Sequence, residues 1–256
     1  MINPVKAKKK LGQHFLTDRD TALKIVSSLS GDVCSVMEIG AGMGILTQFL
    51  LQIPNIDLCV VEIDSESVEY LLGRYPVLEG TVIEKDFLKL DLSAVFRDKF
   101  AVIGNFPYNI SSQILFKILE YKNYIPEVVG MFQKEVAIRI ASQPGKKDYG
   151  ILSVLLQAFY NIEYLFSVDP QVFYPVPKVK SAVIRLRRNA VIDLGCNEIM
   201  FKRLVKIAFN QRRKMLRNSL KSVSFIDGFM QEPIFDKRPE QLSVSEFIFL
   251  TKGMTR

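Results

Sequence analysis

Along most of the chain, two patterns of hydrophobic and polar residues alternate, one typical of buried strands and the other of helices. Short, continuously apolar runs that are typical of buried strands occur at 35–39, 58–63, 81–84, 100–104 and 128–133. Apolar positions three and four residues apart, typical of helices, lie between these runs at 45–52, 66–74 and 112–120. Strands that alternate with helices predict an α/β fold, with a mostly parallel sheet that has helices on both faces.

The last part of the chain departs from this alternation. Two more strands are expected at 162–168 and 181–187, and the absence of a clear helix between them predicts an antiparallel edge. Beyond residue 190 the apolar residues follow one helical stripe, formed by Phe201, Leu204, Val205, Ala208, Phe209, Met215, Leu216 and Leu220. We therefore predict two domains, with the sheet in residues 1–190 and a small all-α domain in residues 191–256.

Composition and charge narrow the class of protein. Hydrophobic residues make up 48% of the chain and charged residues 24%, which is typical of a globular protein. The net charge of +7 favours a polyanionic partner. Three widely spaced cysteines without metal-ligand spacing, and no signal or membrane-spanning segment, predict a metal-free cytoplasmic protein. A single histidine leaves no Ser-His-Asp or zinc constellation to build.

A glycine-rich turn between the first strand of the sheet and the helix that follows is a candidate nucleotide site. Gly40 and Gly42 belong to the run Glu38–Gly44, where glycines let the backbone turn sharply and approach a ligand. Glu62 ends the next strand, 22 residues after Gly40, where a carboxylate can accept hydrogen bonds from ribose hydroxyls. Asp86 follows the third strand, where it can receive an adenine amino group.

The spacing of the glycines distinguishes between two cofactors. A dinucleotide site requires Gly-x-Gly-x-x-Gly at a helix start that faces a pyrophosphate. This chain has Gly-x-Gly-x-Gly preceded by Glu38, and the acidic lining suits a ligand that carries an ammonium and a sulfonium group. The loop therefore favours S-adenosylmethionine over NAD, although a tight turn without any ligand is a common alternative.

The most specific motif is Asn-Phe-Pro-Tyr, residues 105–108, at the end of the fourth strand. The side-chain oxygen of Asn105 and the backbone carbonyl of Phe106 or Pro107 can accept both N–H bonds of an adenine amino group. These bonds would localise the nitrogen lone pair and orient it for methyl transfer, and Pro107 fixes the backbone angle. Tyr108 is expected to stack on a base flipped out of its strand. A plain turn is the alternative interpretation.

Two other segments are expected to complete the site. His14 and Leu16, in the run Leu11–Leu16, are interpreted as lid contacts to the cofactor, although a lone histidine is more often structural. The proline-rich loop 171–181 carries Phe173, which we expect to form the second stacking face for the flipped base. Packing of these aromatics into the core is the alternative.

A basic segment follows in the predicted α-helical domain. Residues 201–221 contain eight basic residues and no acidic ones. A face of one sign favours RNA phosphates over ordinary solvation, because mixed charges are more soluble. The residues expected to bind RNA are Arg212, Arg213, Lys214 and Arg217.

The chain resembles the ribosomal small-subunit RNA adenine dimethyltransferases, which in bacteria act on 16S rRNA. The resemblance rests on five stretches that cover nearly the whole sequence: Leu11–Leu16, Glu38–Gly44, Asn105–Tyr108, Phe173–Ser181 and the basic segment with Asn210–Lys214. It implies a Rossmann-like class I methyltransferase domain, a helical C-terminal domain and a cytoplasmic monomer. It also implies transfer of two methyl groups to each of two adjacent adenosines near the 3′ end of 16S rRNA, within the small subunit or its precursor.

The same resemblance implies the cofactor contacts and shows two departures. By motif position, the residues that contact S-adenosylmethionine are His14, Leu16, Gly40, Glu62, Asp86 and Asn105. The leucine usual after the asparagine is Phe106 here, which is tolerable because this residue contributes its carbonyl. The asparagine usual after Gln13 is His14, which puts the role of His14 in doubt.

Three other functions remain open. A large-subunit (23S) rRNA adenine methyltransferase of the antibiotic-resistance type shares the cofactor loop and the Asn-x-Pro-Tyr turn, but residues 208–221 and 238–242 look more like the small-subunit family. A non-catalytic ribosome-assembly or transcription factor on the same fold is disfavoured by the intact Asn105, Pro107 and Tyr108. An NAD dehydrogenase is disfavoured by the glycine spacing.

Overall fold

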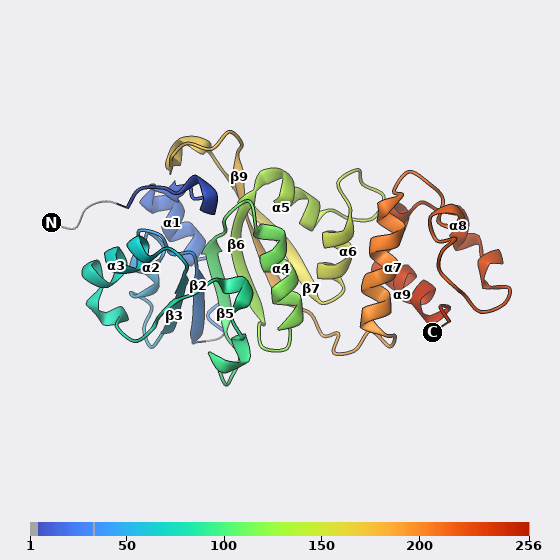
Figure 1. Ribbon diagram of the computed structural model, residues 1–256, viewed down its shortest axis with the longest axis horizontal. Helices are drawn as coiled ribbons and strands as arrows, with labels where there is room; N and C mark the ends of the chain where they lie inside the picture. Colours follow the sequence, from blue (N-terminus) through green and yellow to red (C-terminus); the bar gives the residue numbers. More distant parts are fainter. Residues whose placement is uncertain (1–4, 33, 256) are drawn as a thin grey trace. The chain divides into compact units, whose positions relative to one another are not determined.

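The computed structural model describes residues 5–32 and 34–255. The chain forms two compact units, one of residues 1–137 and 162–188 and the other of residues 138–161 and 189–256 (Figure 1). The boundary near residue 189 lies close to the one predicted. Residues 138–161, however, belong to the second unit, whereas the sequence analysis placed them in the first domain.

The first unit is built on a seven-stranded sheet in the order β4-β3-β2-β5-β6-β9-β7. Strands β4, β3, β2, β5 and β6 run parallel, and β9 pairs antiparallel with β6. The bounds are β2 Ser35–Ile39, β3 Asp57–Glu62, β4 Val82–Glu84, β5 Ala101–Asn105, β6 Glu127–Gln133, β7 Tyr160–Val168 and β9 Ser181–Arg188. The predicted α/β fold with a mostly parallel sheet is confirmed, and so is the antiparallel strand.

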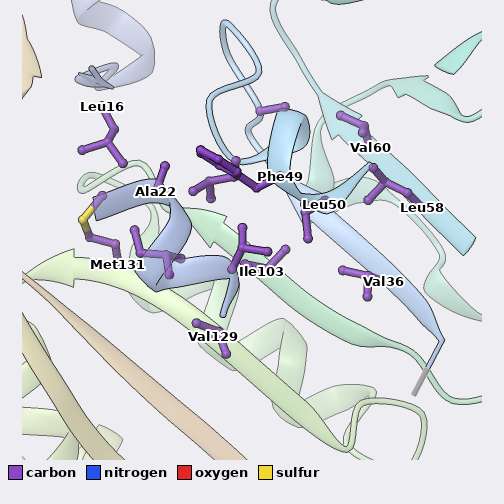
Figure 2. Close-up of a cluster of buried hydrophobic side chains, with 14 of the residues drawn as sticks. Leu16, Ala22, Val36, Phe49, Leu50, Leu58, Val60, Ile103, Val129 and Met131 are labelled. Carbon is purple, nitrogen blue, oxygen red and sulfur yellow. The ribbon is translucent and has the colours of Figure 1, made fainter. Parts of the chain in front are cut away.

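The central strands are buried on both faces, which explains their continuous apolar runs. On one face, α1 and α2 contribute Ala22 and Leu50 to a cluster that includes Val36, Ile103 and Val129 (Figure 2). The side chain of Asp18 caps α1 by accepting a hydrogen bond from the backbone of Thr21 at 2.8 Å. This packing fixes the ends of the strands, where open α/β sheets bind their ligands.

The helices predicted at 45–52, 66–74 and 112–120 are present to within a few residues, whereas the helix that follows β6 was not predicted. The α-helices of this part of the chain are α1 Arg19–Val26, α2 Thr47–Leu50, α3 Ser65–Arg74, α4 Ser111–Glu120 and α5 Lys134–Ala141. Short 3-10 helices lie at Lys9–Leu11, Pro76–Leu78, Phe87–Lys89, Leu92–Ala94 and Pro170–Val172.

A second, two-stranded sheet joins the N-terminal arm to the loop before β9. Strand β1 (Phe15–Leu16) pairs antiparallel with β8 (Phe173–Tyr174), so that Leu16 opposes Phe173. The backbone of Thr17 extends the pairing by donating to the carbonyl of Val172 at 2.8 Å. The sequence analysis did not predict this pair, because two-residue strands leave no periodicity to detect.

The second unit is helical. Its helices are α6 Ile151–Gln157, α7 Glu198–Asn210, α8 Leu216–Ser219 and α9 Val244–Lys252, with 3-10 helices at Phe229–Gln231, Pro233–Asp236 and Pro239–Gln241. Helix α7 packs against α6, α8 and α9. It is capped by Asn197, whose side chain accepts from the backbone of Met200 at 3.0 Å.

The predicted continuous stripe from Phe201 to Leu220 is interrupted. Helix α7 ends at Asn210, residues 211–215 form a turn, and α8 then starts a separate short helix. The apolar residues of the stripe that are buried in this unit are Phe201, Leu204, Val205, Ala208, Leu216 and Leu220, whereas Met215, at the break, is 46% exposed. The basic segment Arg212–Lys214 therefore lies in a turn rather than on a helix.

Candidate active site

A cavity in the first unit lies at the carboxyl edge of the parallel strands. Its volume is about 240 Å³. The residues that follow β2, β3, β4 and β5 line it, together with the segment from Lys10 to Phe15 of the N-terminal arm. Open parallel sheets bind their ligands at this edge. Of the predicted residues, His14, Gly40, Gly42, Glu62, Asp86, Asn105, Pro107 and Tyr108 all line the cavity.

The glycine turn after β2 is shaped by close packing. Gly40 and Gly42 have φ angles of 72° and 54°, in the left-handed region that favours glycine. A Cβ atom on Gly42 would lie 2.8 Å from the ring of Phe15. The turn therefore needs glycine at position 42 both for its conformation and to accept the N-terminal arm.

Glu62 holds this turn in place. Its Oε2 accepts from the backbone of Gly42 at 2.9 Å, and its Oε1 accepts from Ile63 and Asp64 at 2.8 and 2.9 Å. Burial raises the pKa of this carboxyl group, and the backbone hydrogen bonds oppose that rise. A carboxylate has roughly four acceptor positions, so these bonds leave about one for a ligand hydroxyl rather than the pair expected from sequence.

Glu38 is a buried carboxyl group with an unused acceptor. It is 1% exposed, its Oε2 accepts from the hydroxyl of Thr47 at 2.6 Å, and its Oε1 has no hydrogen-bond partner among the described residues. Burial raises the pKa of Glu38 to about 7. Glu38 lines a smaller cavity of about 20 Å³ with Leu16, Gly42 and Asn105. An ammonium group is a suitable partner for such an orphaned oxygen, so the donor set fits the amino-acid end of S-adenosylmethionine.

Asp86 lies in a short loop that a buried lysine secures. Its Oδ1 accepts from the backbone of Leu88 at 3.0 Å. The Nζ atom of Lys117 donates to the carbonyls of Leu88, at 3.0 Å, and of Leu90. Lys117 is 8% exposed, and burial lowers its pKa. The loop keeps Asp86 on the cavity wall, and its Oδ2 accepts no hydrogen bond from the described residues.

The turn after β5 distinguishes between the two candidate carbonyls. The carbonyl of Pro107 accepts from the backbone of Ile110 at 3.2 Å, whereas the carbonyl of Phe106 accepts no bond from the described residues. The ring of Phe106 is 1% exposed and packs edge-on against Phe132. Asn105 donates its Nδ2 to the carbonyl of His14 at 2.9 Å. This bond fixes the amide so that Oδ1 is the atom left for a ligand donor.

His14 and Tyr108 form a stacked pair at the cavity wall. Their ring centroids are 5.4 Å apart with an interplanar angle of 25°. His14 donates from Nδ1 to the carbonyl of Pro175 at 2.7 Å, and the hydroxyl of Tyr108 bonds to Ser181 at 2.6 Å. One face of Tyr108 is thus covered by His14. Ser181, which anchors the tyrosine, was not identified from sequence, although it closes the proline-rich loop.

Phe173 does not lie where the sequence analysis placed it. It is 2% exposed, belongs to the hydrophobic core and does not line the cavity. Its pairing with Leu16 turns both side chains inward. The prediction that Phe173 stacks on a base is therefore wrong for this structure, because the core covers the ring. Leu16 is also in the core and reaches only the smaller cavity.

The N-terminal arm is tied to the sheet by a carboxylate that the sequence analysis missed. Asp64 is 3% exposed and accepts hydrogen bonds from Lys8 and, at 3.2 Å, from Gln13. Lys8 also pairs with Glu66 at 2.9 Å. Lys8 is thus committed to an internal contact. The Glu-x-Asp pattern at the end of β3 was the available signal.

The residues expected to bind RNA divide into two groups. Arg212 donates to the carbonyls of Lys146 and Lys147 and lies 3.9 Å from Glu240, and Arg217 pairs with Asp236. Arg213 and Lys214 are exposed. A surface groove of about 570 Å³ is lined by Gln211, Lys214, Asn218, Ser219, Lys221 and Ser222. The side chains of the basic residues of this groove, Lys214 and Lys221, have no ion-pair or hydrogen-bond partner among the described residues.

Among residues 5–32 and 34–255 no group of three or more His, Cys, Asp or Glu side chains is placed to hold a metal ion. No helix in those ranges is long and apolar enough to cross a membrane.

The sheet order, the glycine turn with its acidic partners and the Asn-Phe-Pro-Tyr turn at one cavity define a class I, S-adenosylmethionine-dependent methyltransferase. Solved structures share this fold. A dimethyladenosine transferase from Plasmodium falciparum aligns with a TM-score of 0.77 at 24% identity, covering 94% of this chain and 99% of that one. The 23S rRNA methyltransferase ErmE aligns with a TM-score of 0.66 at 27% identity, covering 93% and 99%.

The chain belongs to the ribosomal RNA adenine dimethylase family, whose model matches residues 5–245. The ribosomal RNA small subunit methyltransferase A of Cytophaga hutchinsonii is 59% identical over 99% of both chains. The predicted class of enzyme and its cofactor, S-adenosylmethionine, are thereby confirmed, and its substrate is RNA.

Proposed function

We propose that this protein transfers methyl groups from S-adenosylmethionine to the N6 atoms of two adjacent adenosines near the 3′ end of 16S rRNA, two to each. The small-subunit assignment rests on relatives such as the C. hutchinsonii enzyme at 59% identity. The substrate is the small ribosomal subunit or its precursor, the protein acts as a monomer, and its place of action is the cytoplasm, where subunits are assembled.

One observation carries the chemical part of the proposal. The Nδ2 atom of Asn105 donates a hydrogen bond to the carbonyl of His14 at 2.9 Å. The carbonyl of Phe106, the next residue, accepts no hydrogen bond from the described residues. Two acceptors, Asn105 Oδ1 and the Phe106 oxygen, are therefore presented side by side at the cavity. An adenine amino group has two N–H donors, so it matches this pair. Hydrogen bonds from both hydrogens localise the nitrogen lone pair for attack.

The cofactor contacts follow from the cavity walls. Gly40 leaves room for the ligand, and Gly42 makes room for Phe15 of the N-terminal arm. Glu62 accepts from a ribose hydroxyl, and Asp86 accepts from the adenine amino group of the cofactor. Glu38 and Leu16 face the methionine end from the smaller cavity. When bound, S-adenosylmethionine supplies an electrophilic methyl group on a sulfonium. Tyr108 and Pro107 shape the opposite wall for the base.

The second candidate is methylation of 23S rRNA. It is supported by the 27% identity and TM-score of 0.66 to ErmE. The small-subunit relative is more than twice as similar in sequence, so we prefer the 16S substrate.

Parallel transfer assays distinguish the two substrates. The protein is incubated with tritiated S-adenosylmethionine and with undermethylated small or large subunits, and the RNA is digested and its nucleosides are separated. We expect N6,N6-dimethyladenosine from small subunits only, at four methyl groups for each subunit, because two adenosines take two groups each. Label in large subunits alone would replace the proposal with the 23S alternative.

A further inference from the structure

A large aromatic side chain lies in solvent beside the active-site cavity, and the proposed function gives it no role. Tyr174 is 65% exposed, whereas its neighbour Phe173 is 2% exposed. Successive side chains of a strand point to opposite faces, so the inward turn of Phe173 directs Tyr174 outward. Val176 and Val179, in the same loop, are 59% and 45% exposed. These three apolar residues are exposed on one loop, and we refer to them together as the Tyr174 patch.

The strand register places Tyr174 at the rim of the cavity. Tyr174 directly opposes Phe15 across the β1–β8 pair, and Phe15 lines the cavity. Directly opposed residues of an antiparallel pair have their side chains on the same face, with Cβ atoms about 5 Å apart. The next residue, Pro175, accepts the hydrogen bond from His14 at 2.7 Å. Tyr174 is therefore the member of the Tyr174 patch that lies at the cavity wall.

The charges around the patch suit a nucleic acid. Lys178 is exposed and has no partner among the described residues, and Lys10 is an exposed residue on the cavity lining. Lys180, by contrast, is paired with Asp169 at 2.7 Å. An exposed ring with nearby cations is the arrangement that binds single-stranded nucleic acids, because the base stacks on the ring while the phosphate meets the cation.

We propose that Tyr174 is the stacking platform for the RNA base next to the adenosine held in the cavity, and that Lys178 contacts the adjoining phosphate. The inference rests on the proposed function. When two adjacent adenosines are both substrates, one of them must wait outside while the other is methylated. Stacking accepts any base face, so one ring serves whichever nucleotide is outside the cavity.

The kinetics of three variants test the platform on undermethylated small subunits. Tyr174→Ala is expected to raise the KM for subunits by between about 5-fold and 100-fold, as loss of one base stack requires. Its kcat and its KM for S-adenosylmethionine should remain at wild-type values. Tyr174→Phe keeps the ring and should restore the KM. The matched control is Tyr164→Ala on β7, where the tyrosine is 37% exposed, and it should change neither constant.

An abasic nucleotide identifies what the ring contacts. Reconstituted small subunits carry one target adenosine with an abasic nucleotide on its 5′ or 3′ side. If the ring stacks on that base, one of these substrates should slow the wild type about as much as Tyr174→Ala does, and should not slow Tyr174→Ala further. Additive losses would overturn the proposal and assign Tyr174 to a contact with a ribosomal protein.

The outcomes separate this inference from the proposed function. A wild-type KM in Tyr174→Ala, with normal methylation by the wild type, removes the platform and leaves the methyltransferase assignment intact. Absence of methylation by the wild type on small subunits refutes the proposed function, and the platform with it.

Discussion

The amide of Asn105 shows how a single residue is prepared for catalysis before the substrate arrives. Its donor is occupied by the His14 carbonyl at 2.9 Å, so its oxygen is held toward the cavity without a search among rotamers. Orientation of this kind lowers the entropy that the reaction must lose. The N-terminal arm therefore takes part in the chemistry through a backbone atom.

Two substitutions at Asn105 test the amide oxygen and the amide nitrogen separately. Asn105→Ala should lower kcat for methyl transfer at least about 100-fold, because the acceptor for the target amine is lost. Asn105→Asp keeps an acceptor but sets a carboxylate against the His14 carbonyl, so we expect a comparable loss. Single-turnover methylation measures both, and thermal unfolding confirms the fold. Wild-type rates in the aspartate variant would show that the bond to His14 is unnecessary.

Glu38 gives the ligand-free protein a defined pH dependence. Its pKa is raised from 4.5 to about 7 by burial, so the folded protein holds a proton that the unfolded chain releases. The stability from this proton is fully present below pH 4.5 and is lost as the pH rises through 7. Denaturant unfolding should show a loss of about 3 kcal/mol across this window.

The matched variant for this measurement is Glu38→Gln, which keeps an acceptor for Thr47 but does not titrate. The difference in unfolding free energy between the wild type and this variant should fall with pH over the same window. Parallel curves for the two proteins would contradict the assignment of the titration to Glu38.

At the scale of elements, the loop after β4 is positioned by a neighbouring helix. Lys117 of α4 binds two carbonyls of the loop that carries Asp86. Lys117→Met should raise the KM for S-adenosylmethionine about tenfold or more, since hydrogen bonds from charged groups contribute roughly 1.5–3 kcal/mol. The kcat at saturating cofactor should change little.

Lys89→Met is the control, because Lys89 is exposed on the same loop. Lys117→Arg should recover part of the affinity by replacing the donors. If Lys117→Met lowered only the unfolding temperature and left the KM unchanged, Lys117 would have a purely structural role.

The elements also show what a single sequence can and cannot predict. The parallel strands were predicted to within about two residues, since strands buried on both faces appear as unbroken apolar runs. The inward turn of Phe173 could not be predicted, because it depends on pairing with Leu16, far away in sequence. The apolar stripe of α7 continues past residue 210, so apolar spacing could not show that the helix ends there. Site residues at strand ends were found because topology alone brings them together.

At the scale of the whole molecule, some of the basic residues behind the net charge of +7 are paired with other groups of the protein. Lys8, Arg212 and Arg217 have internal partners, whereas Lys214 and Lys221 line a groove. The charge that attracts RNA is therefore smaller and more localised than the sequence total indicates. Its effect is best measured as the dependence of RNA affinity on salt.

Removal of groove lysines should change that dependence. The double variant Lys214→Ala, Lys221→Ala should reduce the slope of log K against log salt by about 1.4 to 1.8, at roughly 0.7–0.9 for each lost phosphate contact. Arg212→Ala should leave the slope unchanged and lower the unfolding temperature instead, because its partners are internal. Filter binding of small-subunit RNA across a salt series measures the slopes. A slope that falls with Arg212→Ala but not with the lysine variant would reverse these assignments.

The two acceptors after β5, Asn105 Oδ1 and the carbonyl oxygen of Phe106, affect when the RNA dissociates. Unmodified adenine offers them two hydrogens, the monomethylated base offers one, and the dimethylated base offers none. In the proposed pose the half-finished base thus keeps one attachment at Asn105 or Phe106 and stays available for a second round. The finished base leaves both oxygens without a donor. The number of hydrogens left on N6 therefore determines whether the base stays bound for a second methylation or dissociates.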